Sequence, residues 1–259
     1  MLLAADIGNT NISIGIFKGS DLIKTWNLSS DKDKTDDEYG IILLNLVNLE
    51  TDPEQLKSAI ISSVVPELTD KFKLGIEKYL SMPTFVISSE TQAGITLDVE
   101  NPKEVGCDRI ANACAASNLY GMPAVVTDFG TATNFDVIMP DKRFIGGIIA
   151  PGLKFSANSF SSFTNLLPKI KVEEIEHVVG RNTVQNMLSG VVIGHAAMID
   201  GLITRIEEEL GMPVTTIATG GFSSAVTKHL KRPFNHFNKN LTLEGLNFIY
   251  ELNKNKARN

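Results

Sequence analysis

Two segments of the sequence combine an aspartate with a short glycine-containing polar turn. Asp6 ends the first apolar run and Asp128 ends a later one, and a glycine stands two residues after each, Gly8 and Gly130. Glycine lets backbone N–H groups approach a phosphate that a Cβ would obstruct. Short side chains able to bond phosphate oxygens follow both glycines: Asn9, Thr10, Asn11, Thr131 and Thr133. These residue types indicate phosphate chemistry.

The two aspartates stand at the carboxyl ends of expected strands. That is where α/β sheets present ligands, and where a carboxylate can hold a hydrated cation. The alternative is that Asp-x-Gly and Asn-Thr only form hairpin turns, and for either copy alone this is the favoured interpretation. The second copy, together with a distal Gly220-Gly221 pair after the apolar strand Val214 to Ala218, favours a nucleotide site. These glycines either offer an adenine ring a flat backbone surface or only form a flexible strand-to-helix turn.

A third segment offers a candidate base. Gly106-Cys107-Asp108-Arg109 opens the helical run Ile110 to Leu119, so Asp108 is expected in or just before the first helical turn. The helix dipole there favours the ionised carboxylate, which can accept a substrate hydroxyl proton. The guanidinium of Arg109 suits a carboxylate or a phosphate. The alternative is an N-cap aspartate beside an exposed arginine.

The apolar patterns predict the elements that must position these residues. Three short strands are followed by alternating helices and strands, and the strand-turn-strand pattern then restarts. The expected elements of the first half are strands Leu2 to Ile7, Ile12 to Phe17, Leu22 to Leu28, Ser58 to Val64 and Thr84 to Ile87, with helices Asp36 to Leu49 and Pro66 to Leu80. The second half is expected to contain strands Ala124 to Phe129, Asn134 to Met139 and Phe144 to Ile149, a long helix Thr183 to Leu210 and a final helix Thr242 to Asn253.

The segments AADIGNTNISIGIF and VTDFGTATNFDVIM are two versions of one strand-turn-strand device. Such an internal repeat predicts two similarly folded halves. We therefore expect an α/β protein of two domains, residues 1–120 and 121–259, that face each other across a cleft. The expected break lies near Gly121-Met122-Pro123.

Composition excludes several classes. A net charge of −6 argues against nucleic acid as a partner. Cys107 and Cys114 are expected two turns apart on one helix, so no disulfide framework is predicted and a cytoplasmic location fits. Neither a signal peptide nor a membrane span is expected at the amino terminus. P-loop, dinucleotide-binding and G-x-S-x-G motifs are absent. The four histidines lack metal-like spacing and are interpreted as surface or core residues: His177, His195, His229 and His236.

Five motifs together resemble the type III pantothenate kinases. They are DIGNTN from Asp6, NPKEVGCDRIANA from Asn101, DFGTAT from Asp128, FIGGIIAPGL from Phe144 and ATGG from Ala218. The resemblance covers nearly the whole chain in the family's order. It implies the acetate and sugar kinase, Hsp70 and actin superfamily, with two ribonuclease-H-like domains, which agrees with the internal repeat.

The resemblance also implies an activity. Members transfer the γ-phosphate of ATP to the 4′-hydroxyl of pantothenate, the first step toward coenzyme A. They act in the cytoplasm as homodimers and need Mg²⁺ and a monovalent cation, K⁺ or NH₄⁺. Neither a membrane nor a nucleic acid is implied as a partner.

Individual roles follow from the same resemblance. Asp108 would accept the proton, Asp128 would ligate the monovalent cation, and Asp6 would hold magnesium through water. Residues expected to contact ATP are Asp6, Ile7, Gly8, Asn9, Thr10, Asn11, Ile12, Ser13 and Thr131. Residues expected to contact pantothenate are Val99, Gly106, Cys107, Asp108, Arg109 and Thr183. Val99 departs from the family, which usually carries a tyrosine there.

The same fold admits other functions. A non-catalytic regulator would not need Asp6, Asp108, Arg109 and Asp128 together, so their retention favours an enzyme. An Hsp70-like ATPase would need a peptide-binding domain, for which 259 residues leave no room. A sugar or acetate kinase would differ in the substrate loop, where the G-x-D-R stretch favours pantothenate.

Overall fold

The chain forms two compact units in a computed structural model that describes residues 1–163, 167–221 and 226–254. The first unit contains Met1–Leu119 together with Leu241–Asn259, and the second contains Tyr120–Asn240. The chain passes from the first unit to the second after Leu119 and returns to the first after Asn240. The segment from Leu241 departs from the expected division, because it belongs with the first unit.

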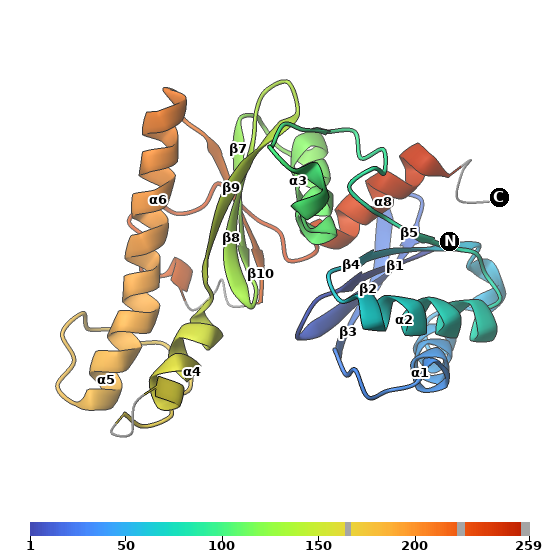
Figure 1. Cartoon of the computed structure of the whole chain (residues 1–259), viewed down its shortest axis with the longest axis horizontal. Helices are drawn as coiled ribbons and strands as arrows, with labels where there is room; N and C mark the ends of the chain where they lie inside the picture. Colours follow the sequence, from blue (N-terminus) through green and yellow to red (C-terminus); the bar gives the residue numbers. More distant parts are fainter. Residues whose placement is uncertain (164–166, 222–225, 255–259) are drawn as a thin grey trace. The chain divides into compact units, whose positions relative to one another are not determined.

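The first unit is built on a five-stranded sheet of order β3-β2-β1-β4-β5 (Figure 1). Its strands are β1 (Leu2–Ile7), β2 (Asn11–Lys18), β3 (Asp21–Ser29), β4 (Ser58–Ser63) and β5 (Thr84–Val86). The first three form an antiparallel meander, whereas β4 runs parallel to β1 and β5 parallel to β4. The central strand β1 is almost entirely apolar because both of its faces are covered.

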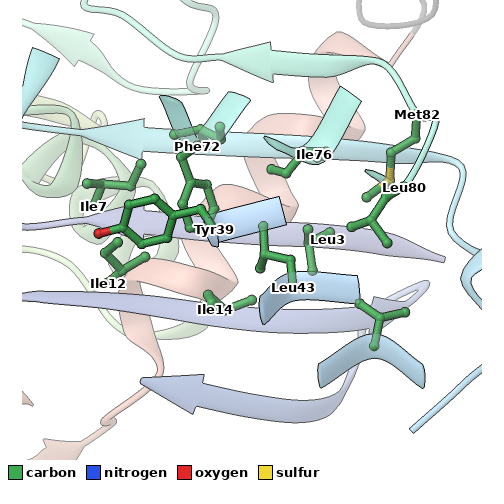
Figure 2. Close-up of a cluster of buried hydrophobic side chains, with 14 of the residues drawn as sticks. Leu3, Ile7, Ile12, Ile14, Tyr39, Leu43, Phe72, Ile76, Leu80 and Met82 are labelled. Atoms are coloured by element: carbon green, nitrogen blue, oxygen red, sulfur yellow. The ribbon is translucent and has the colours of Figure 1, made fainter. Parts of the chain in front are cut away.

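Helices α1 (Asp36–Asn48) and α2 (Pro66–Tyr79) cover one face of this sheet. Alternate residues of the strands, including Leu3, Ile7 and Ile12, pack there against Tyr39 and Phe72 (Figure 2). A capping box starts α1: the Thr35 side chain accepts from the Glu38 amide, and the Glu38 carboxylate accepts from the Thr35 amide. Two 3₁₀ turns, Pro53–Gln55 and Pro102–Glu104, and the short strand β6 (Thr96–Leu97) complete the connections.

Helices α3 (Cys107–Leu119) and α8 (Leu241–Asn253) belong to the other face. They pack tightly on each other: the Thr242 hydroxyl donates to Asn112 Oδ1 at 2.8 Å, and the Cβ of an alanine at Gly245 would lie 1.9 Å from the Ala111 carbonyl oxygen. The Tyr250 hydroxyl bonds Ser58 Oγ on β4 at 2.9 Å. These contacts explain why the final helix returns to the first unit.

The second unit repeats the same sheet. Its strands are β7 (Ala124–Phe129), β8 (Ala132–Ile138), β9 (Arg143–Pro151), β10 (Thr215–Gly220) and β11 (His236–Phe237). These are five of the six strands of this sheet, and they follow the order β9-β8-β7-β10-β11, with β7 to β9 antiparallel and β10 and β11 joined in parallel to β7. The five strands repeat the order and direction of the first sheet, so the α/β fold class and the predicted internal repeat are confirmed.

Helix α4 (Leu153–Phe163) and one long composite helix complete this unit (Figure 1). The composite helix contains α5 (Thr183–Leu188), a π-helical turn (Ser189–Ile193) and α6 (Gly194–Leu210). Within the described residues, it is the one helix long and apolar enough to cross a membrane. Half of its most apolar window is buried inside the protein, where its residues join the core of the second unit, so core packing accounts for its apolar character.

Candidate functional site

The first Asp-Gly turn joins β1 to β2. Ile7 and Ile12 pair across the strands and are fully buried, which anchors the base of the turn. The Gly8 amide donates to the Asn11 carbonyl at 3.0 Å, so this amide closes the turn itself. The side chains of Asn9, Thr10 and Asn11 are exposed at the tip. The turn therefore presents short polar groups to solvent on a rigid, buried base.

Asp6 lies on the face of β1 opposite the Tyr39 core. Its register neighbours are Ser13 on β2 and Ser62 on β4. The Ser13 hydroxyl donates to Asn27 Oδ1 at 3.1 Å, and Ser62 is fully buried. The charge of Asp6 contributes to a raised pKa of the Cys107 thiol, after the larger effects of burial and Asp108. The end of β1 and the start of α3 therefore lie close together within the first unit.

Asp108 is the second residue of α3, so it lies inside the first helical turn and is not the N-cap. Its Oδ1 accepts a hydrogen bond from the Arg109 amide at 2.8 Å. A Cβ at Gly106 would lie 2.4 Å from the same oxygen, so a side chain there would displace the carboxylate from this position. Arg109 is half-buried, which also differs from the exposed arginine of the alternative interpretation.

Burial raises the pKa of the Asp108 carboxyl, while the hydrogen bond from the Arg109 amide and the Arg109 charge act in the opposite direction. The helix dipole was expected to favour the ionised form. Desolvation is instead the largest influence, because the surrounding protein replaces the water that would stabilise the charge. Asp108 is therefore a stronger base than an exposed aspartate.

The second Asp-Gly turn joins β7 to β8. Phe129 and Thr133 pair across its base, and the Gly130 amide donates to the Ala132 carbonyl at 3.0 Å. Thr131 is exposed at the tip, as Asn9 and Thr10 are in the first turn. Thr133 is different, because it is buried and its hydroxyl bonds Nε2 of His195 at 2.9 Å. The described contacts direct Thr133 into the core and away from a phosphate.

The Gly-Gly pair lies directly beside this second turn. Gly220 has a φ of 93°, and a Cβ there would lie 2.7 Å from Asp128 Oδ1 and 2.6 Å from the Phe129 carbonyl oxygen. The Gly221 amide donates to that same carbonyl at 3.2 Å. Glycine is required at position 220 for both the backbone conformation and the close approach to Asp128. The fold thus places the Gly-Gly pair next to the second Asp-Gly turn within the second unit.

The remaining candidates are Thr183 and Val99, which lie outside these turns and the start of α3. Thr183 is the first residue of α5 and is exposed, next to the N-cap Asn182, whose side chain accepts from the Gln185 amide at 2.9 Å. Val99 is partly buried between β6 and the turn Pro102–Glu104. Among residues 1–163, 167–221 and 226–254, no three metal-binding side chains of His, Cys, Asp or Glu come together.

His195 was predicted to be a surface or core residue and lies in the core, but its hydrogen bond with Thr133 was not predicted. The ring also lies 6.3 Å from the ring of Phe129, centroid to centroid. His195 and Thr133 are 62 residues apart, and no spacing in the sequence links them. Cys107 and Cys114 are both free thiols on α3, as predicted.

Curated relatives match the chain along nearly its whole length. A type III pantothenate kinase of Finegoldia magna is 42% identical over 259 residues and covers 98% of each chain. One from Roseiflexus sp. (strain RS-1) is 39% identical over 255 residues, covering 98% of this chain and 100% of the relative. One from Myxococcus xanthus is 39% identical over 254 residues, covering 98% and 99%.

Solved structures of lower identity share the fold. A putative Baf family transcriptional activator from Campylobacter jejuni superposes with a TM-score of 0.60 at 19% identity, over 98% of this chain and 99% of that one. The activator of the 2-hydroxyisocaproyl-CoA dehydratase from Clostridium difficile, with bound ADPNP, superposes with a TM-score of 0.52 at 13% identity. The superposition covers 99% of this chain and 95% of that one. The sequence model described as Type III pantothenate kinase matches residues 2–205. The two Asp-Gly turns, the G-x-D-R helix start and these relatives agree, and the chain belongs to the type III pantothenate kinase family.

Proposed function

We propose that this protein transfers the γ-phosphate of ATP to the 4′-hydroxyl of pantothenate, the first step of coenzyme A synthesis. The relatives of 39–42% identity that span the whole chain are named for this activity. The observation that carries the residue assignment is Asp108, a half-buried carboxylate at the start of α3 whose pKa is raised by desolvation. Phosphoryl transfer depends mainly on positioning and on electrostatic stabilisation, so the chain's own residues are assigned roles of those two kinds.

ATP phosphates are bound by the two Asp-Gly turns. Residues Asp6 to Ser13 form the first phosphate loop, and Thr131 contributes a hydroxyl from the second turn. The exposed tips of both turns, each on a buried strand pair, support this assignment. The adenosine lies over Gly220-Gly221, where the lack of side chains leaves a flat backbone surface beside Asp128.

Asp108 accepts the hydrogen bond of the pantothenate hydroxyl and takes its proton late in the transfer, because the transition state is loose. The raised pKa suits this role, since a carboxylate with a higher pKa takes up a proton more readily. The Arg109 amide holds one carboxylate oxygen, Oδ1, at 2.8 Å. The other oxygen, Oδ2, is assigned to the substrate hydroxyl.

Magnesium fits the residues at the end of β1. Mg²⁺ keeps several of its waters and is usually held by one or two carboxylates together with substrate phosphates. Asp6, with Ser13 and Ser62 as register neighbours, provides such a carboxylate at the edge of the first turn. A bound Mg²⁺ supplies neutralisation of the phosphate charge. Asp6 would hold the ion through its water ligands.

A monovalent cation fits beside Asp128. Asp128 Oδ1 and the Phe129 carbonyl oxygen both approach Gly220 closely, and these oxygens are hard ligands of the kind that K⁺ prefers. The chain has no P-loop lysine to offset phosphate charge. Asp128 therefore holds the positive charge that this region otherwise lacks.

Pantothenate is bound by the start of α3 and by Thr183. Gly106, Cys107 and Asp108 contact the acceptor end, and Arg109 pairs with the substrate carboxylate, for which a guanidinium is well suited. Val99 replaces the tyrosine that is usual in the family, so this pocket has one hydroxyl fewer.

The protein acts as a homodimer in the cytoplasm. Large apolar side chains of the second unit are left exposed in the single chain: Ile149 is 66% exposed, Val178 69% and Val179 82%. Such side chains are covered by a second copy in a dimer. The two free thiols on α3 suit a reducing compartment. Sedimentation of the purified protein as a monomer at micromolar concentration would exclude the dimer.

The decisive experiment is a coupled assay of ADP release with ATP and pantothenate, with glucose and acetate as alternative acceptors. With ATP present, turnover is expected with pantothenate and not with glucose or acetate. Asp108→Asn is expected to lower kcat about 10²-fold or more, the usual scale for a positioned base, with ATP binding little changed. A wild-type protein that binds ATP but phosphorylates none of these acceptors would favour a regulator. An Asp108→Asn variant with near-normal kcat would remove the base assignment only.

A further inference from the structure

His195 is a buried polar residue of the second unit to which the proposed reaction assigns no role. Its exposure is 6%, and that of Thr133 is 1%. Nε2 of the ring lies 2.9 Å from Thr133 Oγ1, with either atom able to be the donor. Leaving either partner unsatisfied in such a buried setting would cost the desolvation of a polar group. The pair is therefore a firm link between helix α6 and strand β8.

This link is placed at the base of the second Asp-Gly turn. Thr133 is the cross-strand partner of Phe129, and these two residues bracket the turn. The His195 ring contacts Phe129 as well, with the ring planes at 50° and the centroids 6.3 Å apart. One side chain of α6 thus touches both strands from which the turn emerges.

The same base carries the groups assigned to ATP. Asp128 directly precedes Phe129, and Thr131 lies in the turn. The Phe129 carbonyl accepts the hydrogen bond of the Gly221 amide at 3.2 Å. A displacement of Phe129 or Thr133 would therefore move the turn tip, the Asp128 carboxylate and the Gly-Gly backbone together.

The π-helical turn decides which residue of the long helix reaches this position. The Gly194 amide donates to the Ser189 carbonyl, so one extra residue is accommodated immediately before His195. In an α-helix each residue rotates the chain by about 100°, so one inserted residue turns the following helix face by that amount.

His195 is neutral at physiological pH, because burial lowers its pKa to about 4. A neutral ring has one nitrogen that donates and one that accepts. It can therefore bond a hydroxyl without bringing a positive charge into the core beside Phe129.

We propose that His195 is a positioning residue that holds the second Asp-Gly turn in its nucleotide-binding conformation through Thr133 and Phe129. This inference rests on the proposed ATP site. Without the link, the turn samples other conformations, and the apparent affinity for ATP falls in proportion to the fraction that remains competent. Loss of one buried hydrogen bond of this kind reduces that fraction about tenfold.

The test compares variants that remove the link with variants that keep it. His195→Ala and Thr133→Val remove it, whereas His195→Gln and Thr133→Ser retain a polar partner. The matched control is His236→Ala, which removes an exposed histidine of the same unit that stacks on Tyr120. Dissociation constants for Mg-ATP are measured by titration calorimetry on the full-length protein, and KM for ATP and for pantothenate in the coupled assay.

His195→Ala and Thr133→Val are expected to weaken ATP binding and raise KM for ATP by about tenfold, with kcat and KM for pantothenate changed less than about twofold. His195→Gln, Thr133→Ser and His236→Ala are expected to stay within about threefold of the wild type. The double variant of His195 and Thr133 should be no worse than either single one, because both remove the same bond.

A purely structural role gives a different result. His195→Ala or Thr133→Val would then lower the melting temperature and the active fraction while ATP affinity stayed within twofold of the wild type, and this would overturn the proposal. If His195→Ala does not fold, Thr133→Val decides alone. If the wild type does not phosphorylate pantothenate, the proposed function fails, and the calorimetric comparison still decides whether His195 positions an ATP site.

Discussion

The packing of α8 on α3 yields a sharp prediction about stability. Gly245 is buried in α8, and an alanine Cβ there would lie 1.9 Å from the Ala111 carbonyl oxygen and 2.5 Å from its carbon. Because Cβ contacts below 3.0 Å are essentially never found, the helices must separate by at least about 1 Å. The obstructing atoms are backbone, so no rotamer change relieves the clash.

The size of the effect follows from opposing contributions. Overpacking costs about 1 to 3 kcal/mol, and the upper end is expected because the clash is with backbone atoms. Moving the two helices apart also weakens the 2.8 Å hydrogen bond between Thr242 and Asn112, which is worth about 1 kcal/mol. Alanine in a helix gains about 1 kcal/mol over glycine. Gly245→Ala should therefore lose about 2 to 3 kcal/mol, which lowers Tm by about 5 to 10 °C for a chain of this size.

Thermal unfolding followed by circular dichroism measures this directly. Gly201→Ala is the matched control, because Gly201 is an exposed glycine inside α6 with nothing within 4 Å of the added Cβ. It should be as stable as the wild type or slightly more stable. Ala111→Gly should not rescue Gly245→Ala, since the clash is with backbone atoms of residue 111. A Gly245→Ala protein that melts with the wild type would refute the close helix contact.

The remaining predictions concern charge and substrate. The neutral state of His195 stabilises the fold fully above pH 6.5, and this contribution is lost as pH falls toward its folded pKa of about 4. The stability difference between the wild type and His195→Gln in urea should therefore shrink by about 2 kcal/mol from pH 7 to pH 5, and a constant difference would contradict the buried neutral ring. If Asp128 holds a monovalent cation, turnover should be low in sodium and rise with potassium or ammonium, whereas equal rates in the three salts would count against this site. Val99→Tyr should lower KM for pantothenate about two- to twelvefold by restoring one hydrogen bond, and an unchanged or higher KM would show that the pocket has been rebuilt.

Local sequence patterns predicted much of the fold. The strands Leu2–Ile7 and Ala124–Phe129 lie at the positions that their apolar runs indicated. Their burial on both faces produces continuous apolar runs that are easy to recognise. The restart of the pattern after residue 120 predicted two similar units, and the matching order of five strands in the two sheets confirms it. The turn motifs were found for the same reason, because each is short and contiguous.

Long-range packing was not predictable in the same way. The final helix was expected in the second half because it follows it in sequence, but the small surfaces of Gly245 and Ala111 let α8 pack on α3 of the first unit. The long helix Thr183–Leu210 was predicted as continuous, and the π-helical turn within it has no periodicity that would reveal it. The order of the elements along the chain only weakly determines which of them pack together, because the fit of their side chains decides between alternative partners.

The sequence by itself determined the residue types of the candidate site: two Asp-Gly turns, a Gly-Gly pair and the G-x-D-R helix start. Only the tertiary structure decided their environments. Burial raises the pKa of Asp108, where the helix dipole was expected to favour the ionised form, and Thr133 bonds His195 in the core where a phosphate contact was expected. The physical reason is that desolvation and buried hydrogen bonds depend on groups far apart in the chain, which no local pattern encodes.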